Sequence, residues 1–395
     1  MWRLFTAVCL LVVIVDGMQR SLPSGELRDC GSFVASATAG AEGLNPYGIY
    51  PLTFHVVMPG FDVWNPNLNP PVSVLLFRVF TTGSPHAALR WWWGLSLACY
   101  LLAVALLVRR YGEHRVLLAL WACAAAGFWD TLALGQIYLP LVLAAVIPWR
   151  LLDRGHGAAA GVLIGVIIAI KPNFAAWPAA LLLAGHVRTP VAAFVSAALM
   201  SAIPLLTHGP AIYAQWADVI LADESRTAFL TNASIPGLAA RLGLPVLGTI
   251  AAAAVLVVLA IWTLRRQPPL LEASAAGIVA GIAASPIAWV HYTLFLLPVF
   301  FRWHRVPLLV PAAVLLVVPV AVVLRYIDAP LWQQMTIGSV YNWAVLLCAL
   351  CFLTGDLRQL LPGGPGRPPP DQGPRERNGR GLTVRRSAKP QLHPA

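Results

Sequence analysis

Asp29 is the acidic side chain whose surroundings most clearly suggest chemistry. It lies in the run Arg28-Asp29-Cys30-Gly31-Ser32-Phe33, just beyond the first apolar segment of a chain that carries few charges. A carboxylate in such a place can accept a proton from a hydroxyl group, which is the role of a general base. Asp62 and Asp130 are rival carboxylates, and Asp29 could instead cap a helix over residues 31–40. We take Asp29 as the first candidate for a catalytic base.

Lys171 and His291 are candidate partners for an anion. Lys171 interrupts an apolar stretch at Ile170-Lys171-Pro172-Asn173. An ionisable side chain at membrane depth costs free energy, so it is a functional candidate by default, and its natural partner is a phosphate or a carboxylate. Alternatively, Lys171 could extend its ammonium to the interface without any chemical role, and His291 could be an ordinary interfacial histidine.

Further polar and aromatic candidates lie at the predicted outer ends of apolar segments: Tyr47, Asn69, Gln136, Asn232 and Trp289. Each has a plainer interpretation. Gln136 could form an interhelical hydrogen bond, and Trp289 could belong to an interfacial aromatic belt. Asn232-Ala233-Ser234 also matches a glycosylation sequon. The whole set of residues, in this order along the chain, is therefore stronger evidence for a functional site than any one of them.

The elements that must position these residues are membrane helices. Of the 395 residues, 58% are hydrophobic and 11% are charged, whereas soluble domains carry about 25% charged residues. The sequence predicts an all-α fold, a polytopic membrane bundle of about 10–12 crossings whose outer loops form the active site. The apolar runs cover residues 4–15, 91–108, 116–128, 137–149, 157–170, 174–183, 191–206, 244–264, 273–289, 292–301, 306–324 and 340–353.

Charge predicts the topology. Basic clusters occur at Arg109/Arg110/Arg115, Arg150/Arg154, Arg188, Arg265/Arg266 and Arg302/Arg305. With twelve crossings and Arg3 inside, every cluster falls on the cytoplasmic side, as basic residues prefer. Both termini are then cytoplasmic, and the loops at residues 19–69 and 207–243 lie outside. This topology places Asp29 on the outer face of a multi-pass plasma-membrane protein.

The sequence divides into residues 1–355, predicted to be the membrane domain, and residues 356–395, which are rich in Pro, Gly and Arg. This second segment cannot bury a core and is predicted to be a disordered, basic cytoplasmic tail. Its charge suits contact with lipid head groups, and nucleic-acid binding is not implied. The cysteines mostly lie in apolar runs, where they act as small hydrophobic residues. The absence of a paired outer carboxylate site predicts no metal and no cofactor.

The order of the motifs resembles that of a known family. Asp29-Cys30-Gly31-Ser32-Phe33 is followed by Gly43-Leu44-Asn45-Pro46-Tyr47, then by Asn69-Pro70-Pro71, Gly135-Gln136, Lys171-Pro172, Asn232-Ala233-Ser234 and Ser285-Pro286-Ile287-Ala288-Trp289-Val290-His291-Tyr292. Over about residues 27–300 the chain is similar to glycosyltransferase family 87, integral-membrane enzymes of the GT-C type. The last motif is the most specific.

The resemblance implies a mannosyltransferase. Its donor is polyprenyl-phosphate mannose, its acceptor is a glycolipid or glycan, and α-1,2 linkage with inversion is expected. Asp29 is then the base, and Lys171 with His291 stabilises the leaving phosphate. Trp289 and Tyr47 offer faces for sugar stacking, Gln136 and Asn232 hydrogen-bond hydroxyl groups, and Asn69 lines the substrate site. Two alternatives stay open: a polyprenyl-phosphate arabinofuranose donor, and a transporter or lipid flippase, although no internal repeat favours transport.

Overall fold

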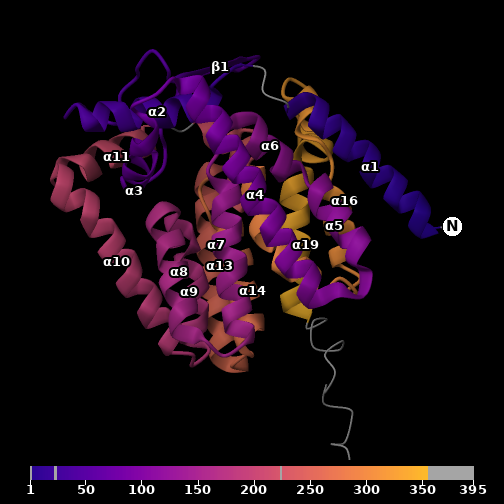
Figure 1. The fold of residues 1–395 in the computed structure, drawn as a ribbon. Coiled ribbons are helices and arrows are strands. Elements are labelled where there is room, and N and C mark those ends of the chain that lie inside the picture. The colour runs from indigo at the N-terminus through magenta and orange to yellow at the C-terminus, as the bar shows by residue number, and fades with distance from the viewer. Residues whose placement is uncertain (1, 22–24, 223–224, 355–395) are drawn as a thin grey trace, which may run out of the picture.

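The computed structural model describes residues 2–21, 25–222 and 225–354, and these form a helical bundle with one short β-hairpin (Figure 1). The α-helices of the first half are α1 (Trp2–Ser21), α2 (Arg28–Ala41), α3 (Val72–Phe77), α4 (Pro85–Tyr111), α5 (Arg115–Ala124), α6 (Ala126–Leu134), α7 (Tyr138–Asp153), α8 (Gly157–Ile170) and α9 (Ala176–Leu183). Those of the second half are α10 (Arg188–His208), α11 (Ala211–Leu221), α12 (Ile235–Arg241), α13 (Pro245–Arg266), α14 (Leu270–Ala283), α15 (Leu297–Arg302), α16 (Leu309–Leu315), α17 (Val320–Val323), α18 (Leu331–Met335) and α19 (Val340–Thr354). The hairpin consists of β1 (Phe54–Met58) and β2 (Phe61–Asn65).

Short 3₁₀ segments connect or extend these helices. They are η1 (Arg78–Phe80), η2 (Gly112–His114), η3 (Pro172–Ala175), η4 (Ser225–Ala228), η5 (Val290–Leu296), η6 (Leu324–Tyr326) and η7 (Ile337–Ser339). The predicted tail at residues 356–395 lies outside the described residues. The predicted division of the chain at residue 355 therefore stays a prediction.

The polytopic membrane bundle is confirmed. Five of the described helices are long and apolar enough to cross a membrane, or up to seven spans when each of two bent pairs counts as one. The prediction of 10–12 crossings also counted shorter apolar runs. For example, residues 157–170 and 273–289 give helices of only 14 residues, Gly157–Ile170 and Leu270–Ala283. A straight crossing needs about 20 residues. Breaks at Pro172 and at the Ser285-Pro286 turn account for several of the short helices, since proline disfavours helix at the preceding residue.

Close packing of α8 against α10 depends on glycine. A Cβ atom added at Gly161 would collide with the carbonyl oxygen of Thr189, and one at Gly165 would collide with that of Ala193. Small residues spaced four apart allow such backbone contact between membrane helices. Nearby, α14 is buried at every residue from Leu271 to Ala283, so it forms the centre of the bundle. These contacts fix α8 and α14 within the bundle.

The bundle has two chemically different ends. At one end, which is uppermost in Figure 1, α2, α11 and the hairpin cover the helices. At the other, Asp153 pairs with Arg110 at 2.5 Å and with Arg302 at 3.9 Å. The 16 residues of α7 connect the two ends, which corresponds to about 24 Å at about 1.5 Å per residue. Arg110 and Arg302, from two of the five arginine clusters predicted to share one side, therefore meet away from the hairpin.

Candidate active site

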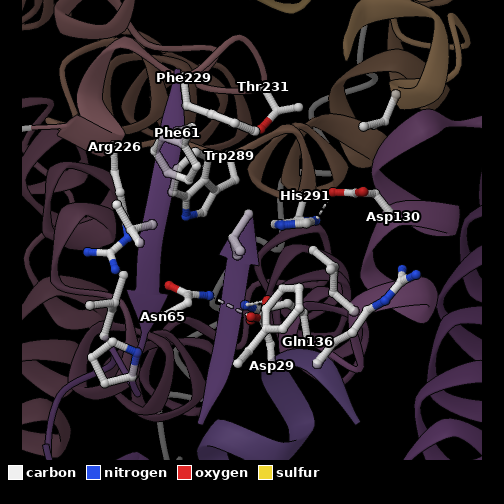
Figure 2. A pocket seen from close by; sticks show the side chains of 18 of the residues that line it. Asp29, Phe61, Asn65, Asp130, Gln136, Arg226, Phe229, Thr231, Trp289 and His291 are labelled. Atoms are coloured by element: carbon white, nitrogen blue, oxygen red, sulfur yellow. Dashed lines mark hydrogen bonds and ion pairs between the residues drawn. The ribbon is translucent and has the colours of Figure 1, made fainter. Parts of the chain in front are cut away.

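Asp29 is buried in the first turn of α2, with only 2% of its surface exposed. Two neutral amides hold its carboxylate: Asn65 Nδ2 donates to Oδ1 at 2.5 Å, and Gln136 Nε2 donates to Oδ2 at 2.6 Å (Figure 2). The side chain therefore serves as a hydrogen-bond acceptor and makes no side-chain cap for α2. Each carboxylate oxygen retains a second lone pair for another donor.

Gln136 reaches Asp29 because of the glycine before it. Gly135 ends α6 with a φ of +67°, in the left-handed region, which glycine adopts without steric cost. A Cβ atom at Gly135 would lie 2.7 Å from Cβ of Cys30. The Gly135-Gln136 pair is thus needed both for the turn and for the close approach to α2.

Asn65 reaches Asp29 from the hairpin. The strands turn at Pro59-Gly60, where Gly60 has a φ of +70°, and the residues of each strand alternate between half-buried and exposed. Ser32 of α2 ties the two strand ends down, since its Oγ donates to the carbonyl of Asn65 at 2.7 Å and accepts from Phe54 N at 2.9 Å. The hairpin is thereby fixed directly over the carboxylate.

Burial raises the pKa of Asp29 from its ordinary value of 3.8 to about 6. Loss of hydration is the main cause, while the hydrogen bonds from Gln136 and Asn65 and the charges of Arg226 and Arg28 oppose it. A carboxylate with this pKa is mostly ionised at neutral pH but binds a proton more readily than an exposed aspartate does. These are the properties of a general base.

Lys171 follows directly after α8 and lies almost entirely inside the protein. Its Nζ donates to the hydroxyl of Tyr138 at 2.7 Å. The same nitrogen lies 4.4 Å from the ring centroid of Tyr138 and 5.2 Å from that of Tyr292, as in cation–π contacts. The ammonium is thus held by two tyrosines.

His291, in the first turn of η5, contacts both the acidic and the aromatic residues. Its Nδ1 lies 3.3 Å from Oδ2 of Asp130 and 3.4 Å from Oγ1 of Thr131. Its ring stacks on that of Tyr138 with centroids 4.8 Å apart. Asp130 therefore orients the imidazole, and Figure 2 shows this pair at the side of the pocket.

These groups line one cavity of about 440 Å³. One wall is aromatic: the ring of Phe229 lies 4.6 Å from that of Phe61 and 6.0 Å from that of Trp289 (Figure 2). Arg226 also lines the cavity, where its guanidinium donates to the carbonyl of Trp64. Burial lowers the pKa of Arg226 to about 10, against the opposing charge of Asp29, and the side chain is still cationic at neutral pH.

Six of the eight residues predicted for the site line this cavity: Asp29, Asn69, Gln136, Lys171, Trp289 and His291. The structure places the rival acids differently. Asp130 also lines the cavity, whereas the side chain of Asp62 is 71% exposed and pairs with His55 at 2.7 Å on the outer face of the hairpin. Of the three carboxylates, only Asp29 is held by two amides.

Asn232 and Tyr47 lie outside the cavity lining. The Asn232 side chain donates to the carbonyls of Thr227 and Pro286, at 2.9 and 3.1 Å, and accepts from the backbone N–H groups of Ser234 and Ala288. With no exposed surface, it connects two loops and is inaccessible as a sequon. Tyr47 donates to the carbonyl of Asn69 at 3.0 Å and belongs to a separate small core. Both residues are placed to position the site from outside it.

Asn65, Arg226 and Phe61 are cavity residues that the sequence analysis did not single out. For Asn65 and Phe61 a signal existed, because Pro59-Gly60 stands between two alternating runs of β-branched and aromatic residues, a pattern typical of a hairpin. Arg226 had no comparable signal. Among the residues that the structure describes, no three His, Cys, Asp or Glu side chains gather as metal ligands. Metal independence stays a prediction.

Comparison with known protein families identifies the family of this chain. The sequence model of glycosyltransferase family 87 matches residues 67–288, which is more than half of the chain. The chain belongs to glycosyltransferase family 87. No curated protein and no solved structure gives a significant match.

Membership in glycosyltransferase family 87 makes the protein a multi-pass membrane glycosyltransferase, so the transporter interpretation is set aside. A glycosyltransferase uses a sugar donor and an acceptor. The family 87 match includes Asn69, Gln136 and Lys171 but ends before Trp289 and begins after Asp29. The roles of Asp29 and His291 therefore depend on the geometry of the cavity.

Proposed function

We propose that the protein transfers a mannosyl residue from polyprenyl-phosphate mannose to a lipid-anchored or cell-envelope glycan. The transfer inverts the anomeric centre, so a β-linked donor gives an α-linked product, with α-1,2 linkage expected. Asp29 accepts the proton of the acceptor hydroxyl as the hydroxyl oxygen attacks the anomeric carbon. The bond from that carbon to the phosphate oxygen breaks, and its electron pair leaves with the phosphate.

The observation that carries this proposal is the hydrogen bonding of Asp29. Asn65 and Gln136 fix both carboxylate oxygens without neutralising their charge. Lys171 and His291 line the same cavity, so a base and a site for an anionic leaving group are available together. Charge stabilisation at the leaving group is often the largest catalytic contribution.

The charge distribution supports an extracytoplasmic active site in the plasma membrane, with cytoplasmic termini. Arg110 and Arg302 meet at the end of α7 that is remote from the cavity. Basic residues favour the cytoplasmic side. The donor's prenyl chain then stays in the bilayer while its sugar enters the cavity from outside. An impermeant thiol reagent on intact cells should label Val57→Cys, at an exposed hairpin position, and should not label Arg109→Cys.

The proposed function is tested by transfer of labelled mannose to a glycolipid fraction in detergent. Asp29→Asn keeps the shape of the side chain but removes the base, so transfer should fall by about 10²–10⁴-fold. Asp62→Asn is the matched control, because this carboxylate lies on the outer face of the hairpin, and it should keep wild-type activity. Full activity in Asp29→Asn together with its loss in Asp130→Asn would assign the base to Asp130 instead.

The sugar is tested in the same assay. Polyprenyl-phosphate mannose and polyprenyl-phosphate arabinofuranose are supplied separately to the wild-type protein. Transfer of mannose alone is expected, and transfer of arabinofuranose alone would overturn the donor assignment while leaving the role of Asp29 intact.

A further inference from the structure

Tyr138 and Lys171 both line the cavity, and 1% of the surface of Tyr138 is exposed. The Lys171 ammonium is largely enclosed, with 8% of the residue exposed. Its hydrogen bond goes to the Tyr138 hydroxyl, and the rings of Tyr138 and Tyr292 lie beside it. Among the described residues, Lys171 forms no ion pair with a carboxylate. Its positive charge is thus directed at a phenol oxygen.

The Tyr138 hydroxyl keeps its own proton in this contact, with the ring centroids of Tyr138 and Tyr292 4.9 Å apart. An ammonium group has donors and no acceptor, so the phenol oxygen must be the acceptor from Lys171, and the phenol keeps its own proton for another partner. A charged donor on the oxygen polarises the O–H bond and strengthens the hydrogen bond that it donates. Lys171 and Tyr138 therefore act as one polarised donor.

The surroundings of Tyr138 suit an anion. Tyr138 lines the cavity together with His291 and Asp29, and its ring stacks on the imidazole of His291 at 4.8 Å. The phenol and the imidazole therefore lie side by side in the lining of the cavity. Asp29, the proposed base, is hydrogen-bonded to Gln136, two residues before Tyr138, so the segment that holds the base also carries the proposed donor.

We propose that the hydroxyl of Tyr138 makes the direct hydrogen bond to the departing prenyl phosphate, with Lys171 acting through it. This inference depends on the proposed function. When the anomeric carbon–oxygen bond breaks, its electron pair stays on the phosphate, whose charge changes from −1 to −2. The acceptor's proton goes to Asp29, and Tyr138 keeps its proton throughout. The hydrogen bond strengthens as charge develops, so it lowers the barrier more than it tightens ground-state binding.

Tyr138→Phe tests the inference because it keeps the ring, its stacking and its cation–π contact. We expect kcat to fall by about 100-fold, as when one donor to a developing anion is removed, with the KM for the acceptor little changed. Tyr100→Phe is the matched control, since it removes another buried hydroxyl, one that donates to the carbonyl of Ala122 at 2.7 Å. This control should keep the wild-type kcat.

Lys171→Met provides the discriminating measurement. If Lys171 acts through Tyr138, the double variant Tyr138→Phe/Lys171→Met should be no slower than the slower single variant by more than about twofold, because coupled residues are not additive. Direct contact between Lys171 and phosphate predicts the opposite: a small effect of Tyr138→Phe, below about threefold, and losses that multiply.

Binding of farnesyl phosphate, measured by calorimetry, tests the role of Tyr138 separately from the proposed function. Wild-type protein should bind it, and Tyr138→Phe should bind it about tenfold more weakly, since a hydrogen bond to a charged group is lost. If the wild type transfers mannose and binds farnesyl phosphate while Tyr138→Phe matches it in both, the inference is overturned. If the wild type neither binds farnesyl phosphate nor transfers sugar, the proposed function itself fails.

Discussion

The two ends of α7 place a carboxylate in opposite settings. Near its first residue, Asp29 accepts hydrogen bonds from two neutral amides. At its last residue, Asp153 pairs with Arg110 and Arg302. A cationic partner favours the charged form of an acid strongly, whereas an amide favours it only through a hydrogen bond. The choice of partner therefore decides whether a carboxylate can act as a base or serves as an electrostatic anchor.

The largest expected contrast between the ends is in pH dependence. The folded pKa of Asp29 is raised to about 6, so the active, ionised form is lost as pH falls through that value. At about pH 4 about 1% of the base is ionised, and transfer should be about 100-fold below its plateau. Initial rates across pH, with circular dichroism to confirm the fold, measure this. A rate that stays constant down to about pH 4 would contradict the assignment of Asp29.

An intermediate loss of transfer is expected when Gln136, one of the two amide partners of Asp29, is replaced by an acid. Gln136→Glu places a second carboxylate against Asp29, which should raise the pKa of the pair because two like charges repel. Transfer at neutral pH should fall by about tenfold, and the pH profile should move to higher pH. Gln136→Leu removes the donor without adding charge and should shift the profile less. Equal profiles for the two variants would show that the amide does not set the basicity of Asp29.

The smallest effect on transfer is expected at the end of α7 where Asp153 pairs with two arginines. Asp153→Asn removes the charge between Arg110 and Arg302, and such partly exposed pairs contribute about 1 kcal/mol or less. Thermal unfolding in detergent should change little, and transfer should stay at the wild-type level. A loss of transfer comparable to that of Asp29→Asn would erase the distinction between the two ends.

The helical bundle was predictable because apolar runs specify membrane helices with little dependence on tertiary contacts. The meeting of Asp29, Gln136, Lys171 and His291 in one cavity was also predicted, from their positions at the outer ends of the runs. Ionisable and polar groups are rare there, so each one is informative.

The remaining parts of the site depend on contacts between distant segments. Asn65 lies 36 residues from Asp29, and only the folded hairpin brings them together. Asn232 was predicted to bind a sugar, but its amide is fully used by loop carbonyls and backbone N–H groups. In the sequence both are simply asparagines in polar loops. Which one faces a ligand is decided by backbone partners that no local pattern encodes.

The attachment of the hairpin to α2 through Ser32 has a consequence for the order of events. Any movement that lifts β2 to admit a bulky molecule also withdraws Asn65 from the carboxylate. The base is then incompletely oriented until the strand returns. The attachment of the hairpin and the orientation of the carboxylate thus depend on the same strand end.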